Sequence, residues 1–166
     1  MTGAELLVEA FGRIRESVHQ VADGLSPEQL AFAVRPGANT IGWLLWHLAR
    51  VQDDHIAEVA GTDQVWDTDG WADRFGLPFD TAATGFGQSP DEVAAVRVEA
   101  DQLTGYYDAV HARTLDYVTA LSDKDFDRVV DERWDPPVTL GVRLVSVVND
   151  DTQHVGQAAF VRGVLA

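Results

Sequence analysis

Two residues near the C-terminal end of the sequence have the types and spacing of metal ligands. Asp150 and His154 are four positions apart. On a helix this spacing separates two side chains by about 40° and about 6 Å, so both can reach one ion. Asp151, three positions before His154, offers a second carboxylate at about 60° on the other side, nearer to the apolar positions of the segment. The periodicity leaves the choice between the two aspartates open.

A third ligand must come from another segment, and His47 is the natural candidate because it lies on an otherwise apolar helix face. His55 fits the same ion less well, since eight helical residues place it about 12 Å further along and rotated by about 80°. Two imidazoles and one carboxylate leave coordination positions open, which suits a catalytic zinc, nickel or iron ion. We therefore expect a divalent metal, zinc in the first place.

The simpler interpretation of each residue alone is structural. A single histidine on a helix is more often a packed or surface residue than a ligand, and aspartates are by themselves usually solvated charges. His19 and His111 have polar neighbours and no visible partner, so we expect both at the surface. It is the convergence of several ligand types on apolar faces that favours a metal site.

Four long segments of helical periodicity would position these residues, because their apolar residues recur every three to four positions. The segments cover residues 5–22, 41–60, 90–121 and 140 to the end of the sequence. Capping residues precede the last three: Thr40, the capping box SPDE at 89–92, and Thr139. A short helix is also expected after Ser26, which is followed by a proline and a capping-box glutamine.

One connection is much longer than the others. Residues 61–88 show no persistent helical or alternating period, yet aromatic residues are distributed through them, which argues against disorder and for a functional loop. These are Trp66, Trp71, Phe75, Phe79 and Phe86. Residues 126–138 form another connector, in which some extended structure is expected. We therefore predict an all-α fold, a four-helix bundle with a long crossover connection between its second and third helices.

Composition excludes several classes of partner. The 166 residues are close to the usual size of one domain, and 46% of them are hydrophobic. The net charge of −15 would repel nucleic acid and anionic membranes, and no stretch has the roughly 18 apolar residues of a membrane span. No basic and apolar leader opens the sequence, so a cytoplasmic location is expected. Without cysteine, thiol chemistry has to use a thiol supplied from outside.

Four stretches of the sequence resemble the DinB-like superfamily. They are NTIGWLLWHL at residues 39–48, WADRFGLP at 71–78, TGFG at 84–87 and DDTQHVGQ at 150–157. The sequence is also similar to the mycothiol-dependent maleylpyruvate isomerase and thiol S-transferase branches of that superfamily. The resemblance implies one DinB-like helical domain over residues 1–166, folded as a four-helix bundle with a divalent metal inside it.

The resemblance also implies a set of ligands. In the superfamily, a histidine of the second helix joins a pair on the fourth helix, in which a histidine or glutamate is followed, after three residues, by a histidine. At the matching positions this sequence has His47, Asp150 and His154. The aspartate departs from the usual histidine or glutamate and has a shorter side chain. By this analogy Asp150, and not Asp151, is the carboxylate ligand.

The activity that the resemblance implies is that of a metal-dependent thiol S-transferase or isomerase. A low-molecular-weight thiol similar to mycothiol would be deprotonated by the metal and would attack a small electrophile. Asp151, Gln157 and His55 are candidates for supporting the ligands or contacting the substrate, and the 61–88 loop would shape the pocket. The alternative is a non-catalytic, stress-related binding or dimerisation module in which the polar pair belongs to a buried hydrogen-bond network. Exposed loop tryptophans would favour a homodimer.

Overall fold

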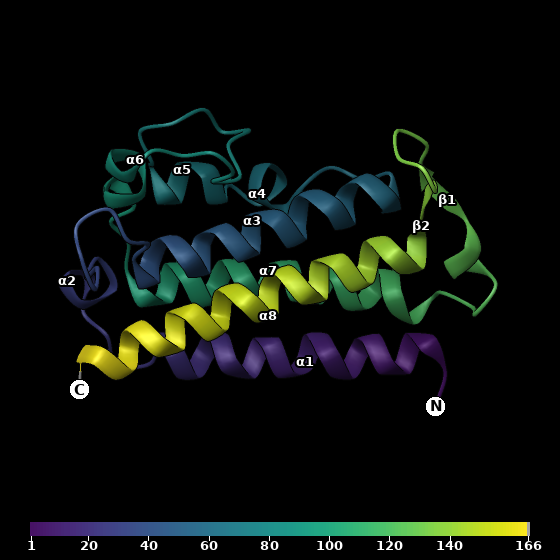
Figure 1. Cartoon of the computed structure of the whole chain (residues 1–166), viewed down its shortest axis with the longest axis horizontal. Coiled ribbons are helices and arrows are strands. Elements are labelled where there is room, and N and C mark those ends of the chain that lie inside the picture. The colour runs from purple at the N-terminus through teal and green to yellow at the C-terminus, as the bar shows by residue number, and fades with distance from the viewer. Residues whose placement is uncertain (166) are drawn as a thin grey trace.

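Four long helices form the body of the molecule within residues 1–165, the part of the chain that the computed structural model describes. They are α1 (Gly3–Ala22), α3 (Ile41–Ala60), α7 (Ala100–Thr119) and α8 (Leu140–Leu165). In Figure 1, α1 and α8 run in one direction and α3 and α7 in the other. Helix α3 packs on α7 and α8, and α1 packs on the same two helices. The predicted all-α four-helix bundle is confirmed.

The ends of α3 follow the capping chemistry that the sequence shows. The Thr40 hydroxyl accepts a hydrogen bond from the backbone N–H of Trp43 at 3.1 Å, which satisfies a donor that the first turn of a helix leaves free. Gly61 ends the helix with a φ of 67°, a left-handed conformation that favours glycine. The short helix α2 (Pro27–Leu30) follows Ser26 as expected.

The long connection is required because α3 and α7 are parallel. After α3 ends, the chain has to return along the bundle before α7 can begin, and it does so across one side through short helices (Figure 1). These are α4 (Val65–Thr68), α5 (Trp71–Phe75) and α6 (Pro90–Ala95). Trp66 and Phe75 are buried and contact Tyr106 of α7. The aromatic residues of the loop therefore anchor it to the bundle, although Phe86 is 94% exposed.

The prediction of one continuous helix over residues 90–121 is wrong. Residues 96–99 are extended and separate α6 from α7. Val96 and Val98 are buried while the residue after each is exposed, which is the period of extended chain. The segment passes over Gly42, where an added Cβ would lie 3.4 Å from Val98 Cγ2. Close packing on α3 therefore overrides the helical period at this point.

The connector before α8 contains the expected extended structure. A short 3-10 turn, η1 (Asp125–Asp127), leads into β1 (Val129–Asp131), which pairs antiparallel with β2 (Val138–Thr139). The buried carboxylate of Asp131 accepts a hydrogen bond from Arg143 of α8 at 3.4 Å. This contact ties the hairpin to the bundle.

The core between the helices is apolar but also contains polar side chains. Its largest fully buried side chains include Trp46 and Tyr106, and the buried polar ones include Arg50, Asp53 and Asp151. Buried polar groups need partners, and their contacts therefore bear on function as well as on stability. None of the helices in residues 1–165 combines the length and apolar character needed to cross a bilayer.

Candidate metal centre

The structure brings His47, Asp150 and His154 together. One ligand atom of each lies within 4.8 Å of the others, and the centroids of the two imidazole rings are 4.7 Å apart. His47 comes from α3, and the other two come from the same face of the neighbouring α8. Ligand atoms at about 2.1 Å from a tetrahedral ion are about 3.4 Å apart. Small side-chain rotations would therefore bring these three ligand atoms to the separations that a bound ion requires.

One oxygen of the Asp150 carboxylate makes no hydrogen bond. Its Oδ2 atom is buried without a hydrogen-bond partner. It lies 3.2 Å from His154 Nδ1, but that nitrogen donates to the backbone carbonyl oxygen of Asp150 at 2.8 Å. A buried carboxylate oxygen without a partner is unfavourable unless a cation or a donor completes it. The residues present therefore fit a divalent ion, and His154 would offer it Nε2.

The charges of the three side chains also suit a metal. Burial lowers the pKa of His47, so its imidazole is neutral at neutral pH. Burial opposes the charge of Asp150, but the contact with His154 and nearby charges bring the pKa of this carboxyl below its usual value. The same contact raises the pKa of His154. A proton on His154 therefore competes with an ion, which has to displace it.

The crossover loop holds His47 in one orientation. The Nδ1–H of His47 donates to the Thr84 carbonyl oxygen at 2.5 Å, which leaves Nε2 as the nitrogen with a free lone pair. The ring also stacks on Trp43, with centroids 4.6 Å apart and an interplanar angle of 15°. Gly85 lets the loop come this close, because its φ is +98° and an added Cβ would lie 2.7 Å from His47 Nδ1.

Replacing Gly85 with alanine is expected to weaken zinc binding by about 10- to 100-fold, the usual effect of losing a group that orients a ligand. The new methyl group would displace the Thr84 carbonyl from His47. Gly87→Ala is a matched control, because Gly87 also has a positive φ (+75°) but nothing lies within 4 Å of its added Cβ. Competition with a chromogenic chelator measures both affinities. Equal affinities would show that the close approach of Gly85 does not orient His47.

A pocket of about 300 Å³ opens beside the three side chains. Its lining residues are His47, Val51, Asp54, His55, Thr84, Phe86 and Asp150. Two of the candidate ligands thus border the pocket, so a small molecule inside it can reach an ion that they hold. The volume lies at the lower end of the range for small-molecule sites, roughly 300–1,000 Å³.

The other residues singled out from the sequence are placed differently. His55 lines the same pocket as the ligands. Gln157 is exposed and lines a separate groove, together with Phe160. Asp151 is fully buried and does not line the pocket. Of the two aspartates that the periodicity left open, Asp150 is therefore the one beside the histidines.

Asp151 has no hydrogen-bond partner for either carboxylate oxygen. Burial raises the pKa of this carboxyl well above its usual value, and the neighbouring charge of Asp150 raises it further. Asp151 therefore binds its proton more tightly in the folded chain than in the unfolded one. Its position nearer to the apolar stripe of the sequence was the signal for this burial.

Asp151→Asn is expected to make stability less dependent on pH. Because the folded pKa is raised, the wild type has its full stability below the unfolded pKa of about 3.9 and loses stability as the pH rises toward the folded pKa. Asparagine has a similar shape and does not ionise, so the variant should match the wild type near pH 4 and exceed its stability at neutral pH by more than about 1.4 kcal/mol, the equivalent of one pKa unit. Urea unfolding across this range, with the exposed Asp116→Asn as control, measures the difference. Parallel curves for Asp151→Asn and wild type would contradict the prediction.

The sequence profile of the DinB superfamily matches residues 10–158. The chain belongs to the DinB superfamily. Among solved structures, this DinB chain is similar to a conserved protein from Enterococcus faecalis, with 30% sequence identity and a TM-score of 0.91 over 98% of this chain and 96% of that chain. A DinB-like protein from Bacillus cereus has 18% identity and a TM-score of 0.59, over 95% of this chain and 89% of that one, a similarity that shows the fold alone. The comparison with curated proteins gave no match.

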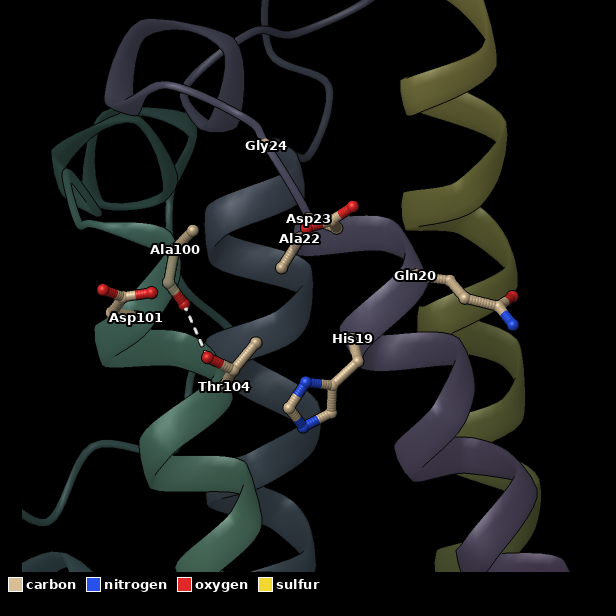
Figure 2. Close-up of a pocket in the computed structure, with 8 residues that line it drawn as sticks. All are labelled: His19, Gln20, Ala22, Asp23, Gly24, Ala100, Asp101 and Thr104. Atoms are coloured by element: carbon tan, nitrogen blue, oxygen red, sulfur yellow. Dashed lines mark hydrogen bonds between the residues drawn. The ribbon is translucent and has the colours of Figure 1, made fainter.

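Of the two histidines of this DinB chain expected at the surface without partners, His111 is buried, whereas His19 is partly exposed but has a partner. His111 is only 9% exposed, and His19 Nε2 lies 2.8 Å from Asp108 Oδ1. His19 also lines a pocket of about 380 Å³, whose other residues lie at the end of α1 and the start of α7 (Figure 2). The candidate ligands do not line this second pocket, and none of its lining residues has a buried polar side-chain atom without a partner. We assign it no ligand.

Arg50 also supports the candidate metal centre of this DinB chain, although it is not among the residues predicted from the sequence. Its side chain is fully buried and donates hydrogen bonds to Gln64 Oε1 at 2.6 Å and to the Ala83 carbonyl oxygen at 3.2 Å. The guanidinium also lies over the ring of Trp66, 4.7 Å from its centroid. Arg50 therefore anchors the part of the loop that precedes Thr84. A charged residue one turn after His47, on a largely apolar helix, was the available signal.

Proposed function

We propose that this protein is a metal-dependent thiol S-transferase or isomerase that acts on a small electrophile. His47, Asp150 and His154 hold a divalent ion, with zinc in the first place and nickel or iron as alternatives. The observation that carries the proposal is the convergence of their ligand atoms within 4.8 Å, beside a pocket. When bound, the ion lowers the pKa of a coordinated thiol, so that the thiolate forms near neutral pH.

The residues of the chain provide binding and orientation. Thr84 and Trp43 fix the ring of His47, and burial keeps it neutral, so that Nε2 is available as a ligand. Three protein ligands leave a coordination position for a further group. Because the chain has no cysteine, the thiol enters as a cosubstrate, a low-molecular-weight compound similar to mycothiol. The adjoining pocket admits a small electrophile.

Thiol consumption tests the proposal. Zinc-loaded protein is mixed with mycothiol, glutathione or N-acetylcysteine and with a panel of small electrophiles, and the loss of free thiol is followed. A rate above that of free thiol with zinc, which disappears in His154→Ala, is the expected result. If no thiol and electrophile pair reacts faster with the loaded protein than with zinc alone, the proposal fails.

The alternative function is a non-catalytic, stress-related binding module. One observation favours it, because His47 and His154 both donate to backbone carbonyl oxygens, as they would in a structural network. A buried network is stabilising only when all its members have partners. Asp150 Oδ2 has an ionic contact with His154 at 3.2 Å but no hydrogen bond, which weighs against a complete network.

A homodimer remains a proposal, but the loop tryptophans that suggested it do not support it in the structure. Trp66 is buried and Trp71 is partly buried, so these loop tryptophans do not form an exposed patch. Trp134 and Phe160 are instead 66% and 68% exposed, and they are the apolar side chains that a second chain would cover in a dimer. Sedimentation velocity tests the dimer, and a single monomeric species at high protein concentration would contradict it.

A further inference from the structure

His55 forms a second polar end of the pocket beside the metal centre. We propose that the Nε2–H of His55 donates a hydrogen bond to an uncharged carbonyl oxygen, as in an amide or an ester, of a small ligand whose other end reaches the metal centre. The binding of one end of the ligand to the metal rests on the proposed function. The new part of the inference is that His55 Nε2–H is the donor at the other end of the ligand and that an uncharged carbonyl oxygen is its acceptor.

Arg143 decides which nitrogen of His55 carries the hydrogen. Its Nη1 atom lies 3.2 Å from His55 Nδ1, and a guanidinium has donors only. His55 Nδ1 must therefore supply a lone pair, and a neutral imidazole with this lone pair on Nδ1 has its hydrogen on Nε2. Because Arg143 occupies the Nδ1 edge, Nε2 is the ring nitrogen left for a ligand in the pocket that His55 lines.

Arg143 is itself held in place, which makes it a positioning residue. Its side chain is only 10% exposed, and its guanidinium also contacts the carboxylates of Glu58 and Asp131. Asp131 is further held by Arg133, with Nη2 and Oδ2 2.8 Å apart. The charge of Arg143 is therefore balanced by carboxylates, and Arg143 does not line the pocket.

The charges around the pocket select the acceptor. The carboxylates of Asp54 and Asp150 line it, whereas its described lining includes no lysine or arginine. Asp54 is kept in place by a hydrogen bond from Gln64 at 2.8 Å. Because Asp150 would be paired with the ion, Asp54 is the carboxylate that would repel a carboxylate or phosphate at the His55 end of the ligand. An uncharged carbonyl oxygen can accept an N–H there without repulsion. Val51 and Phe86 give apolar surface for the carbon skeleton between the two ends.

The separation of the two ends sets the shape of the ligand. His55 follows His47 by eight residues on α3, which is about 12 Å along the helix axis. Asp150 borders the pocket that both histidines line, and the volume of that pocket is about 300 Å³. The ligand is therefore a small, elongated molecule, polar at both ends.

The hydrogen position on His55 can be tested without any metal. Long-range ¹H–¹⁵N correlation spectra of metal-free protein with ¹⁵N-labelled histidine distinguish the two neutral tautomers, and His55→Gln assigns the signal. The expected pattern is a hydrogen on Nε2, which becomes a mixture of tautomers in Arg143→Met. Arg133→Met is the control, because Arg133 pairs with Asp131 and has no hydrogen bond to His55. A hydrogen on Nδ1 in the wild type would overturn the proposal.

The acceptor class is tested with metal-anchored probes. Three hydroxamic acids of equal length, which end in a primary amide, an isopropyl group or a carboxylate, are titrated into zinc-loaded protein by calorimetry. The amide should bind about fivefold more tightly than the isopropyl compound, as expected for one net hydrogen bond, and more tightly than the carboxylate. In His55→Phe this preference should disappear while the isopropyl compound binds as before.

The outcomes separate this inference from the function on which it rests. If all three hydroxamic acids bind wild type equally, or if the carboxylate binds best, the role of His55 is wrong and the metal centre stands. If none of them binds, the metal centre itself is wrong, and this inference falls with it.

Discussion

Zinc binding is expected to fall at least 100-fold when His154 is replaced with alanine. Loss of a group that merely orients a ligand weakens metal affinity by about 10- to 100-fold, so the loss of a ligand should weaken it further. Only His47 and Asp150 would remain of the three groups whose ligand atoms converge. Mass spectrometry of the metal after incubation with zinc and desalting should give about one ion per wild-type chain and almost none per variant chain.

His19→Ala is the matched control for this experiment. His19 is also a partly exposed histidine beside an aspartate, with Nε2 2.8 Å from Asp108 Oδ1, but it lies away from the candidate ligands. The control should bind zinc as the wild type does. Equal and near-zero metal in wild type and His154→Ala would exclude the site.

The same site predicts a pH dependence of zinc affinity. The contact with Asp150 raises the pKa of His154, so a proton occupies this ligand up to a higher pH than in a free histidine. Zinc affinity of the wild type should therefore rise with pH through the raised pKa of His154, with release of a proton on binding. Calorimetry in buffers of different ionisation enthalpy measures that proton, and its absence would contradict the assignment of His154.

Arg50→Met is expected to lower the free energy of unfolding by about 3–5 kcal/mol, as is usual when one partner of a buried ion pair is removed. The Arg50 guanidinium is fully buried, with Nη1 3.8 Å from Asp53 Oδ2. Burial raises the pKa of Asp53 above its usual value, and hydrogen-bond donors and Arg50 offset only part of this rise. Methionine therefore leaves a buried carboxyl without its countercharge. Urea unfolding measures the loss.

Arg13→Met is the control for Arg50→Met. Arg13 pairs with Glu9 at 2.8 Å, but its side chain is 76% exposed, and a surface pair contributes only about 0–1 kcal/mol. Arg50→Met should also weaken zinc binding, because Arg50 anchors the loop before Thr84. Equal loss of stability in the two variants would show that the buried network around Arg50 does not stabilise the fold.

Features that depend on neighbouring residues were predictable from the sequence. Thr40 and Gly61 set the ends of α3, because helix capping and left-handed glycine are local chemistry. The four-residue step from Asp150 to His154 likewise placed both on one face of a helix. His47 was predicted as their partner, and its approach to them is a matter of how α3 and α8 pack.

Features that depend on contacts between distant segments were not predictable in this way. The extended residues 96–99 lie where the chain packs over Gly42, which comes more than fifty residues earlier. The partners of Arg50 come from the crossover loop. Asp150 and Asp151 differ by about 100° around α8; the apolar stripe indicated the burial of Asp151, but only the packing of α8 against α3 places Asp150 beside His47.

The division of the metal centre between α3 and α8 has a consequence for biosynthesis. A nascent chain contains His47 and the loop that orients it long before Asp150 and His154 have been translated. One imidazole alone is a weak ligand, so the proposed centre would not hold an ion until the residues of α8 had been added. Metal loading would then be a late event of maturation, and it would fasten the α8 segment to a scaffold that had been made before it.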